Sequence, residues 1–381
     1  MKTLAYQDAD GRFMTYVDRN RWRWLFSLAI PLLPFAGIVL AEVTGRRWLL
    51  WMPIAFIYVA LPVIDWLIGT DPHSPPEEVV PDLEQDPFYR WLVFSAVPLH
   101  VGVLIGGFWY AMTQTQGLPE TLAIVVSLGF SGALAINTGH ELGHKGDKPH
   151  RILSMISLAV SGYGHFRIEH NLGHHVQVAT PEDSASARMG ESIYRFARRE
   201  MPGAVLRAWQ LEAGRLRRAG RQPWSPGNEI LQAFSITLLL QGGLVAWLGW
   251  KALPWLVLHN LWAWFQLTGV NYIEHYGLLR QRLDDGRYER CRPRHSWNSN
   301  HLVSNLLLFH LQRHSDHHVH AERRYHLLRH FDEAPQLPSG YMGMLVLSYF
   351  PALFFRVMDP RLLAQVNGNL NCVNLDSRSR A

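Results

Sequence analysis

Residues 118–145 read LPETLAIVVSLGFSGALAINTGHELGHK. Within this stretch, residues 118–138 are almost entirely apolar or small, and Glu120 near the beginning is their only charged residue. A helix of about 20 such residues is long enough to cross ~30 Å of hydrocarbon at ~1.5 Å per residue. His140 and His144 follow directly, four residues apart and therefore on one face of a helix. The stretch predicts a membrane-spanning helix that ends in a pair of candidate metal ligands.

Five further apolar runs have a similar length, and together the six predict an all-α, six-helix integral membrane bundle. The predicted spans are residues 24–43, 49–68, 91–112, 118–138, 230–250 and 253–273. Many of the 15 Trp residues flank these runs, where interfacial aromatic side chains belong. A shorter apolar run at 345–357 cannot span a bilayer and predicts a packed or interfacial helix.

Basic residues predict how the bundle is oriented. Residues 139–229 hold thirteen Lys and Arg and residues 274–381 hold fourteen, whereas the links 44–48 and 113–117 hold two and none. The positive-inside rule then places both termini and both long polar segments in the cytoplasm. The predicted organisation is a cytoplasmic N-terminal segment (1–23), four spans (24–138), a cytoplasmic segment (139–229), two spans (230–273) and a cytoplasmic C-terminal segment (274–381).

Composition excludes several classes of protein. The formal net charge of +5 does not indicate nucleic-acid binding, because the basic residues lie in polar segments beside apolar runs. Cys291 and Cys372 form no CxxC pair, which argues against thiolate metal sites and a disulfide framework. The N-terminal segment lacks the apolar core of a signal peptide. The most informative number is the 20 histidines.

Nine of these histidines fall in four short clusters near predicted span ends or in the polar segments. They are His140 and His144; His170, His174 and His175; His275; and His314, His317 and His318. Nine imidazoles exceed the roughly four to six ligands of one ion and predict two neighbouring metals. The adjacent pairs 174/175 and 317/318 point about 100° apart on a helix, so each pair could serve both metals. Imidazole suits iron, zinc, copper and nickel, so ligand type alone does not select the metal.

Each cluster has a carboxylate beside it, and these carboxylates are candidates to orient the imidazole rings. A ligating histidine commonly donates its other ring N–H to a carboxylate or a carbonyl. The residues predicted to orient ligands rather than to bind metal are Glu141, Glu169, Glu274 and Asp316.

Two other readings of the histidines are weaker. The string HELGH matches the zinc metalloprotease signature, with Glu141 as general base, but a protease site leaves six clustered histidines unexplained. A membrane metal transporter would place ionisable residues deep inside its spans. Here Glu42, Asp65 and Glu120 all lie near span ends.

Longer strings around the clusters resemble those of the alkane 1-monooxygenases, a family of histidine-rich membrane di-iron hydroxylases. The strings are NTGHELGHK (137–145), EHNLGHH (169–175), NYIEHYGL (271–278) and LQRHSDHH (311–318). PPEEVVP (75–81), RMGESIY (188–194) and HSWNSNH (295–301) also resemble this family. The resemblance covers roughly residues 14–376 and includes every clustered histidine.

This resemblance implies a six-helix fold with a cytoplasmic cap that holds two iron ions, cycling between Fe2+ and Fe3+, on the nine clustered histidines. It implies that Asn271 lies close to a metal. The implied reaction is hydroxylation of medium-chain n-alkanes to 1-alcohols with O2, in the inner membrane of a bacterium with the site on the cytoplasmic side. The alternative is a fatty-acid desaturase, or another hydroxylase, of the same membrane di-iron class.

The resemblance also implies that electrons come from rubredoxin, which a rubredoxin reductase reduces. A rubredoxin iron site needs four cysteines and this chain has two, so we expect the donor to be another chain or a domain fused beyond residue 381. Arg195, Arg198 and Arg199 are the predicted docking face for this acidic donor, unless they only contact lipid headgroups. The segments 51–66 and 99–109 are candidates to line the alkane channel.

Overall fold

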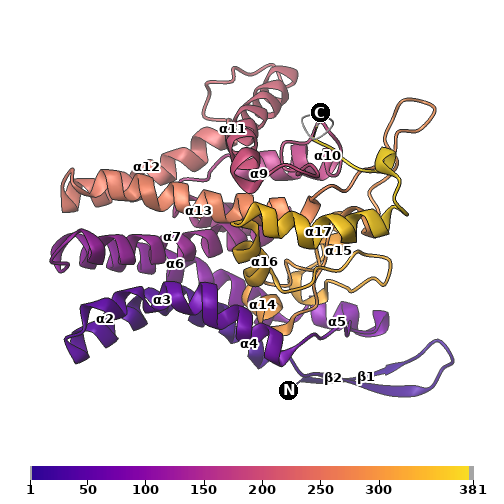
Figure 1. Cartoon of the computed structure of the whole chain (residues 1–381), viewed down its shortest axis with the longest axis horizontal. Coiled ribbons are helices and arrows are strands. Elements are labelled where there is room, and N and C mark those ends of the chain that lie inside the picture. Colours follow the sequence, from indigo (N-terminus) through magenta and orange to yellow (C-terminus); the bar gives the residue numbers. More distant parts are fainter. Residues whose placement is uncertain (1, 377–381) are drawn as a thin grey trace.

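The computed structural model describes residues 2–376, and most of them are helical. Four long helices run side by side along the longest axis of the molecule (Figure 1). They are α6 (Pro87–Thr113), α7 (Leu118–Gly143), α12 (Glu229–Leu248) and α13 (Ala252–His275). Loops and short helices gather at the right-hand end of this bundle in Figure 1, and it is these segments that carry most of the clustered histidines.

The first two predicted spans are helical but are divided into short parts. A proline stands in the first turn of four of these eight parts, because proline lacks a backbone N–H and breaks the helical ladder behind it. The α-helical parts are α1 (Phe26–Ala29), α2 (Leu33–Thr44), α3 (Met52–Ala55) and α4 (Leu61–Ile68).

Among the described residues, five helices are long and apolar enough to cross a membrane, and the chain is an integral membrane protein. They are Trp22–Thr44, Arg47–Ile68, Pro87–Thr113, Leu118–Gly143 and Glu229–Leu248. The sixth predicted span, 253–273, is helical within α13, but this helix is not one of the five. Polar side chains such as Asn260, Gln266 and Asn271 lower its mean hydropathy. The number of six spans therefore stays a prediction.

The N-terminal segment corrects the all-α expectation. Strands β1 (Lys2–Gln7) and β2 (Phe13–Asp18) form an antiparallel hairpin with Lys2 opposite Asp18. Its loop contains Asp10 and Gly11, and Gly11 has a φ of 78°, which glycine adopts without steric cost. An Asp-Gly pair between two runs with strand propensity is a hairpin signal that was present in the sequence.

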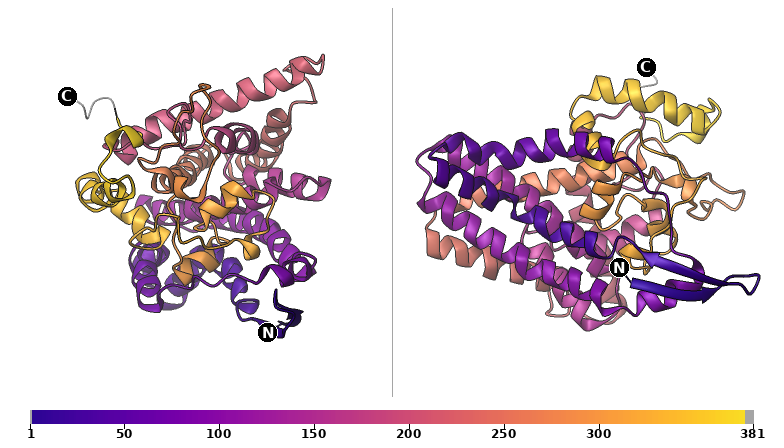
Figure 2. Two further views of the ribbon diagram at one scale, coloured as in Figure 1. Left: turned by 90° about the vertical axis from the view of Figure 1, so that its right-hand side faces the viewer. Right: turned by 90° about the horizontal axis from the view of Figure 1, so that it is seen from below.

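The polar segments fold into a layer at one end of the bundle, which contains short elements and one long helix, α11 (Figure 2). The 345–357 run, predicted as one packed helix, is divided between two helices, because Pro351 begins a new helix after a break at Tyr349 and Phe350. The helices of this layer are α5 (Val80–Glu84), α8 (Lys148–Ala159), α9 (Phe166–Glu169), α10 (His175–Gln177), α11 (Ile193–Arg218), α14 (Leu302–Leu307), α15 (His314–Val319), α16 (Tyr341–Ser348) and α17 (Pro351–Gln365).

Helix α7 is the centre of the molecule and connects the bundle to the layer. It packs against α6, α8 and α13, and 83% of its most apolar stretch of 18 residues is buried. Gly139 lets α8 approach closely, since a Cβ there would lie 2.8 Å from Cγ of Leu158. A second connection joins α4 to α14, where buried Asp65 accepts hydrogen bonds from the backbone N–H groups of Val303 and Ser304. These contacts hold the histidine-bearing elements against the ends of the apolar helices.

Candidate metal centre

All nine clustered histidines lie together and divide into two groups. Within each group, one ring nitrogen per residue lies within 4.8 Å of those of the others. Group 1 contains His140, His144, His170, His175 and His317, and group 2 contains His174, His275, His314 and His318. The groups are neighbours, because the ring centroids of His175 and His318 are 4.5 Å apart. Each adjacent pair in the sequence, 174/175 and 317/318, contributes one residue to each group.

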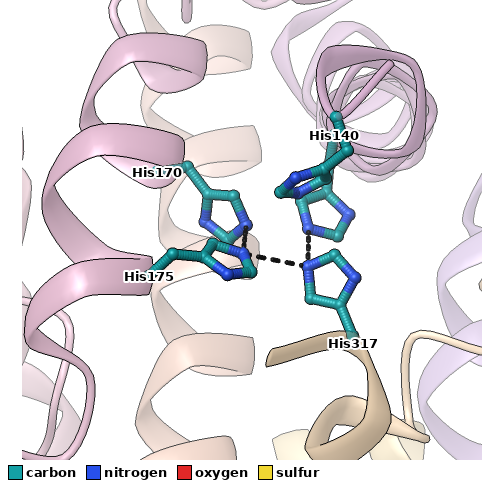
Figure 3. A group of neighbouring side chains, drawn as sticks. His140, His170, His175 and His317 are labelled. Atoms are coloured by element: carbon teal, nitrogen blue, oxygen red, sulfur yellow. Dashed lines mark hydrogen bonds between the residues drawn. The ribbon is translucent and has the colours of Figure 1, made fainter. Parts of the chain in front are cut away.

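Group 1 draws its histidines from three parts of the chain (Figure 3). His140 lies in the last turn of α7, and its Nε2 is 3.0 Å from Nε2 of His317 on α15. Nε2 of His175 lies 3.0 Å from Nε2 of His170 and 3.1 Å from Nε2 of His317. His144, at the end of α7, adds a fifth ring, whose centroid is 4.5 Å from that of His317. The imidazoles thus converge on one point from separate elements.

A π-helical turn, η6 (His170–His174), sets which histidine of the second cluster enters which group. In an α-helix His170 would share a face with His174, four residues on. A π turn closes i→i+5 hydrogen bonds, and here His170 shares its group with His175 instead. On α15, which is a regular α-helix, the residues four apart, His314 and His318, do share a group. Single π turns are frequent at functional sites.

All four histidines of group 2 are buried. His275 is the last residue of α13, and its Nε2 is 3.2 Å from Nε2 of His314. Nε2 of His318 is 2.9 Å from the same atom. His174 brings the fourth ring, whose centroid is 4.9 Å from that of His275.

The donor set of both groups fits bound metal ions. Two neutral imidazoles cannot hydrogen-bond through Nε2 atoms that both carry a lone pair, and yet several Nε2 atoms meet at about 3 Å. Nε2 of His144 and Nε2 of His174 are buried without a hydrogen-bond partner among the described residues. A cation between the rings would accept all of these lone pairs. A site of neutral imidazoles alone suits a transition metal.

Polar groups behind the rings fix the tautomer that such a site needs. Nδ1 of His174 lies 2.9 Å from a carboxylate oxygen of Asp183, and Nδ1 of His275 lies 3.4 Å from the carbonyl oxygen of His295. Nδ1 of His314 lies 3.3 Å from Oε1 of Glu274 but makes no hydrogen bond among the described residues. A proton held on Nδ1 leaves the Nε2 lone pair free to face a metal.

Asp183 is the residue of this site that sequence reasoning missed. Its carboxylate is completely buried and also accepts hydrogen bonds from Ser186 Oγ at 2.7 Å and Arg207 Nη2 at 2.8 Å. Burial raises the pKa of Asp183, but its contacts with His174, Arg207 and Ser186 outweigh burial and hold the pKa far below its usual range. The spacing in the sequence gives no signal, since Asp183 lies in a loop nine residues from His174.

Arg207 reaches this carboxylate across the π turn. It comes from α11, and a Cβ at position 173 would lie 2.8 Å from its Nε, so Gly173 leaves room for the guanidinium. The same guanidinium pairs with Glu169 and donates to Oε1 of Gln177 at 2.8 Å. The guanidinium thus ties α11 to the segment 169–177, which carries three of the histidines.

Of the four carboxylates predicted to orient ligands, Glu274 is the one that contacts a clustered histidine among the described residues. Glu141 lies 3.4 Å from Lys145 Nζ, and Glu169 pairs with Arg207. Asp316 accepts from Arg323 at 2.8 Å and lies 2.9 Å from His320, a histidine outside both groups. In the described part of the chain, the contacts given for Glu141, Glu169 and Asp316 are thus with basic residues and with His320, and their role in orienting ligands stays a prediction.

Asn271, expected close to a metal, lies one turn before His275 on α13. Its Nδ2 donates to Oε1 of Glu200 at 3.3 Å, and Thr268 Oγ1 donates to Oε2 of Glu200 at 2.7 Å. Glu200 is a buried carboxylate of α11. Burial raises the pKa of Glu200 to about 7. The structure thus places Asn271 in a polar contact between α11 and α13.

The three arginines of the predicted docking face differ in their environments. Arg195 pairs with Asp376 at 2.7 Å. Arg199 pairs with Glu191 at 2.9 Å and donates to the carbonyl oxygen of Ser184 at 3.0 Å. Arg198 is exposed and has no ion pair within the described part of the chain.

Comparison with known proteins agrees with this site. Residues 119–348, which include all nine histidines, match the family model described as fatty acid desaturase. The chain is 50% identical to an alkane 1-monooxygenase of Ectopseudomonas oleovorans over 96% of this chain and 91% of that protein. It is 49% identical to alkane 1-monooxygenase 1 of Alcanivorax borkumensis, over 98% of this chain and 92% of that protein.

A more distant relative is the xylene/toluene monooxygenase hydroxylase component of Pseudomonas putida, which is 28% identical over 87% of each chain. The identity to the alkane 1-monooxygenases is far higher and extends over nearly the whole chain. This chain therefore belongs to the alkane 1-monooxygenase family, within the larger fatty acid desaturase family.

Proposed function

We propose that this protein hydroxylates the terminal methyl group of medium-chain n-alkanes at a centre of two iron ions. The balanced reaction is R–CH3 + O2 + 2 e− + 2 H+ → R–CH2OH + H2O. The observation that carries the proposal is the convergence of nine histidines in two neighbouring groups, in a chain about half identical to alkane 1-monooxygenases along nearly its whole length.

Each histidine group would hold one iron. Side chains cannot activate O2 or a methyl C–H bond by acid–base chemistry, so bound iron supplies the redox chemistry of the reaction. The protein's part is to hold the rings with Nε2 directed inward. Asp183 and the His295 carbonyl oxygen do this for His174 and His275, because each accepts a hydrogen bond from the Nδ1–H group of its ring.

A small, partly open cavity of about 30 Å3 near the histidine-bearing elements is the proposed position of the alkane. At one end it is lined by Asn137, three residues before His140, and by Leu311, three residues before His314. Its other lining residues are mostly apolar and come from α7, α13, α16 and the turn after α14: Phe130, Ala133, Leu134, Gln266, Leu267, Val270, Leu308, Met342 and Leu345. Flexible Leu and Met side chains can move apart for a longer chain. An apolar lining excludes water from the reacting methyl group.

This cavity differs from the channel expected from composition. Neither the 51–66 segment nor the 99–109 segment lines it. Tyr58 approaches it indirectly, through a hydrogen bond to Gln266 in the cavity wall. The alkane would reach the cavity from the bilayer, between the apolar helices that surround it.

Rubredoxin is the proposed electron donor, as a separate chain or a domain fused beyond residue 381, and rubredoxin reductase reduces it in turn. The proposed topology has six spans within residues 24–138 and 230–273, in a bacterial inner membrane. The two polar segments, with the histidine centre, then face the cytoplasm, where a soluble donor can reach them. Arg198 is the arginine of the predicted face that remains free to meet an acidic donor.

The decisive experiment uses the purified, iron-loaded protein with reduced rubredoxin, n-octane and 18O2. We expect 1-octanol that contains one 18O atom. His140→Ala should abolish the product, whereas His73→Ala is the matched control, because the His73 side chain is exposed and lies outside both groups. An octene or an unlabelled alcohol would contradict the proposal. An octene would instead favour the desaturase chemistry that the larger family name describes.

A further inference from the structure

Helix α11 lies across the bundle, whereas the four long helices run along it (Figure 1). In the view down the long axis, the C-terminal end of α11 projects beyond the side of the bundle (Figure 2). The chain then turns back and enters α12, one of the helices long and apolar enough to cross a membrane. Residues 206–228, which form this end of α11 and the turn that follows, are called the α11 arm. The arm therefore lies beside the boundary between membrane and water, where the span of α12 begins.

Three arginines of the arm carry unpaired charge. Arg217, Arg218 and Arg221 are exposed, and none of them has an ion pair among residues 2–376. The segment 213–228 contains no acidic residue. Its charge is therefore entirely positive, which favours an anionic partner.

Large apolar side chains lie beside these charges. Trp224 is 76% exposed, and its ring centroid is 4.6 Å from that of Trp209 on α11. Leu206 is 63% exposed and lies three residues before Trp209, so the two side chains are neighbours on the helix surface. Tryptophan is enriched where a membrane meets water, because its ring is apolar with one polar N–H group. Exposed Trp and Leu next to arginines are typical of a helix that lies in this interface.

The turn that presents Trp224 is held in a fixed conformation. Nδ2 of Asn228 donates to the carbonyl oxygen of Pro223 at 2.9 Å. Nη2 of Arg215 donates to the carbonyl oxygen of Gly227 at 3.0 Å. These hydrogen bonds close the turn on both sides of Trp224. The exposure of this large apolar ring is therefore a feature of the fold, and a ring held outward in this way indicates a partner surface.

We propose that the α11 arm binds anionic phospholipids of the membrane in which the protein is embedded. Arg217, Arg218 and Arg221 contact the headgroup phosphates, because a guanidinium group presents paired N–H donors that match phosphate oxygens. Leu206 and Trp224 enter the boundary between headgroups and acyl chains. The inference depends on the membrane-spanning character of the chain and is independent of the reaction proposed above.

An acidic protein is the other partner that three arginines would fit, but the position of the arm favours lipid. Arg221 lies nine residues before Ile230, which begins the apolar part of α12. Basic residues so close to the end of a span lie at the depth of the headgroups. An exposed Trp beside them matches the same depth, whereas an acidic protein would reach them only from the water side.

The test measures lipid binding by the purified, iron-loaded protein. The arm variant replaces Arg217, Arg218 and Arg221 with Gln. The matched control replaces three other exposed arginines with Gln, Arg282, Arg290 and Arg292, and so removes the same charge. These control residues belong to the 279–292 loop, which projects from the layer away from the bundle (Figure 2).

Native mass spectrometry counts the lipids that remain bound when phosphatidylglycerol and phosphatidylcholine are offered in equal amounts. We expect the wild type to retain phosphatidylglycerol preferentially. Loss of one arginine should weaken the first bound phosphatidylglycerol about five-fold, and loss of all three should weaken it on the order of 100-fold. The control variant should bind phosphatidylglycerol as the wild type does.

A nitroxide label reports where the arm lies. Cys291→Ser and Cys372→Ser remove the natural thiols, and Gln222→Cys then places one label at an exposed position of the arm. In bilayer discs that contain phosphatidylglycerol, this label should be less accessible to a water-soluble nickel chelate than in discs of phosphatidylcholine alone. A label at Asp284→Cys, in the 279–292 loop, should be equally accessible in both discs.

Four results would overturn the inference. They are equal retention of the two lipids by the wild type, an equal loss of phosphatidylglycerol in the arm and control variants, and equal accessibility of the Gln222→Cys label in both discs. The fourth is a higher KM for rubredoxin in the arm variant with unchanged phosphatidylglycerol affinity, which would assign the arginines to an acidic protein. Inorganic phosphate should not displace the bound lipid; displacement would identify a site for free anions and would also contradict the proposal.

Discussion

His170 and His175 are five residues apart and bring their Nε2 atoms within 3.0 Å of each other. The π turn between them makes this possible, because it adds one residue to the helical repeat. His174, between them in the chain, then points to the other group and to Asp183. One irregular turn thus divides three neighbouring histidines between the two histidine groups.

This division predicts different losses from two adjacent substitutions. His175→Ala should remove a ligand of the first metal and His174→Ala a ligand of the second, so each should lower bound iron from about two to about one per chain. Elemental analysis of purified protein measures this, and iron-edge spectroscopy should show that different ions remain. His73→Ala is the control. Full iron content in both cluster variants would contradict the two-group assignment.

A second prediction concerns the carboxylates behind the rings. Asp183→Asn should weaken iron binding by roughly 10–100-fold, because a neutral amide accepts the hydrogen bond from Nδ1–H of His174 less strongly than the charged carboxylate does. Glu274→Gln should act in the same direction but more weakly, because Glu274 lies 3.3 Å from Nδ1 of His314 without a hydrogen bond. Glu141→Gln should have a smaller effect, because Glu141 contacts Lys145 rather than a ring. Chelator competition gives the affinities, with exposed Asp82→Asn as control. An equal loss in Glu141→Gln and Asp183→Asn would refute the assignment of Asp183.

The sequence was sufficient to predict the apolar helices and the histidine clusters. Length and hydropathy determine a span, and four-residue spacing determines a shared face on α7 and on α15. The same spacing rule would place His170 and His174 on one face and so in one group, which is wrong. The cause is the π turn, which has no clear signature in the residues of HNLGH. Asp183 could not be found at all, since its contact with His174 depends on how a loop returns to the helix.

Other departures have equally local causes. The β1–β2 hairpin was missed although Asp10-Gly11 indicates a turn, because the short alternating runs on either side are mostly exposed and carry a weak pattern. Asn271 and Glu200 meet through the packing of α11 on α13, which neither residue's neighbours in the sequence reveal. Long-range contacts between polar side chains are thus the part that the sequence does not supply.

Glu200 gives a prediction about pH. Because burial raises its pKa to about 7, the folded protein keeps this proton at a pH where the unfolded chain has lost it. The stability that this proton contributes is full below about pH 4.5 and is lost as pH rises through about 7. Glu200→Gln cannot lose a proton. Its melting temperature relative to wild type should therefore increase between about pH 5 and pH 8, by the equivalent of on the order of 3 kcal/mol.

The measurement is best made on metal-free protein, so that bound cations do not change the carboxylate. The buried histidines give both proteins the same pH dependence, and the difference between the two curves isolates Glu200. Glu78→Gln, at an exposed position, should follow the wild type at every pH. A constant difference between wild type and Glu200→Gln across this range would show that Glu200 is already ionised in the folded protein.

The last prediction concerns the electron donor. Of the three arginines of the predicted docking face, Arg195 and Arg199 are held by Asp376 and Glu191, so their charge is largely neutralised. Arg198 is exposed, and a surface cation of this kind attracts an acidic protein electrostatically. Physiological salt screens this attraction at separations beyond ~8 Å. Arg198→Glu should raise the apparent KM for rubredoxin several-fold at low ionic strength and leave the KM for the alkane unchanged. The difference from wild type should shrink as salt is added.

Arg46→Glu is the matched control, because Arg46 is also exposed but lies in the 44–48 link, at the end of the bundle away from the histidines. Equal rubredoxin KM values in the two variants would exclude Arg198 from the docking face.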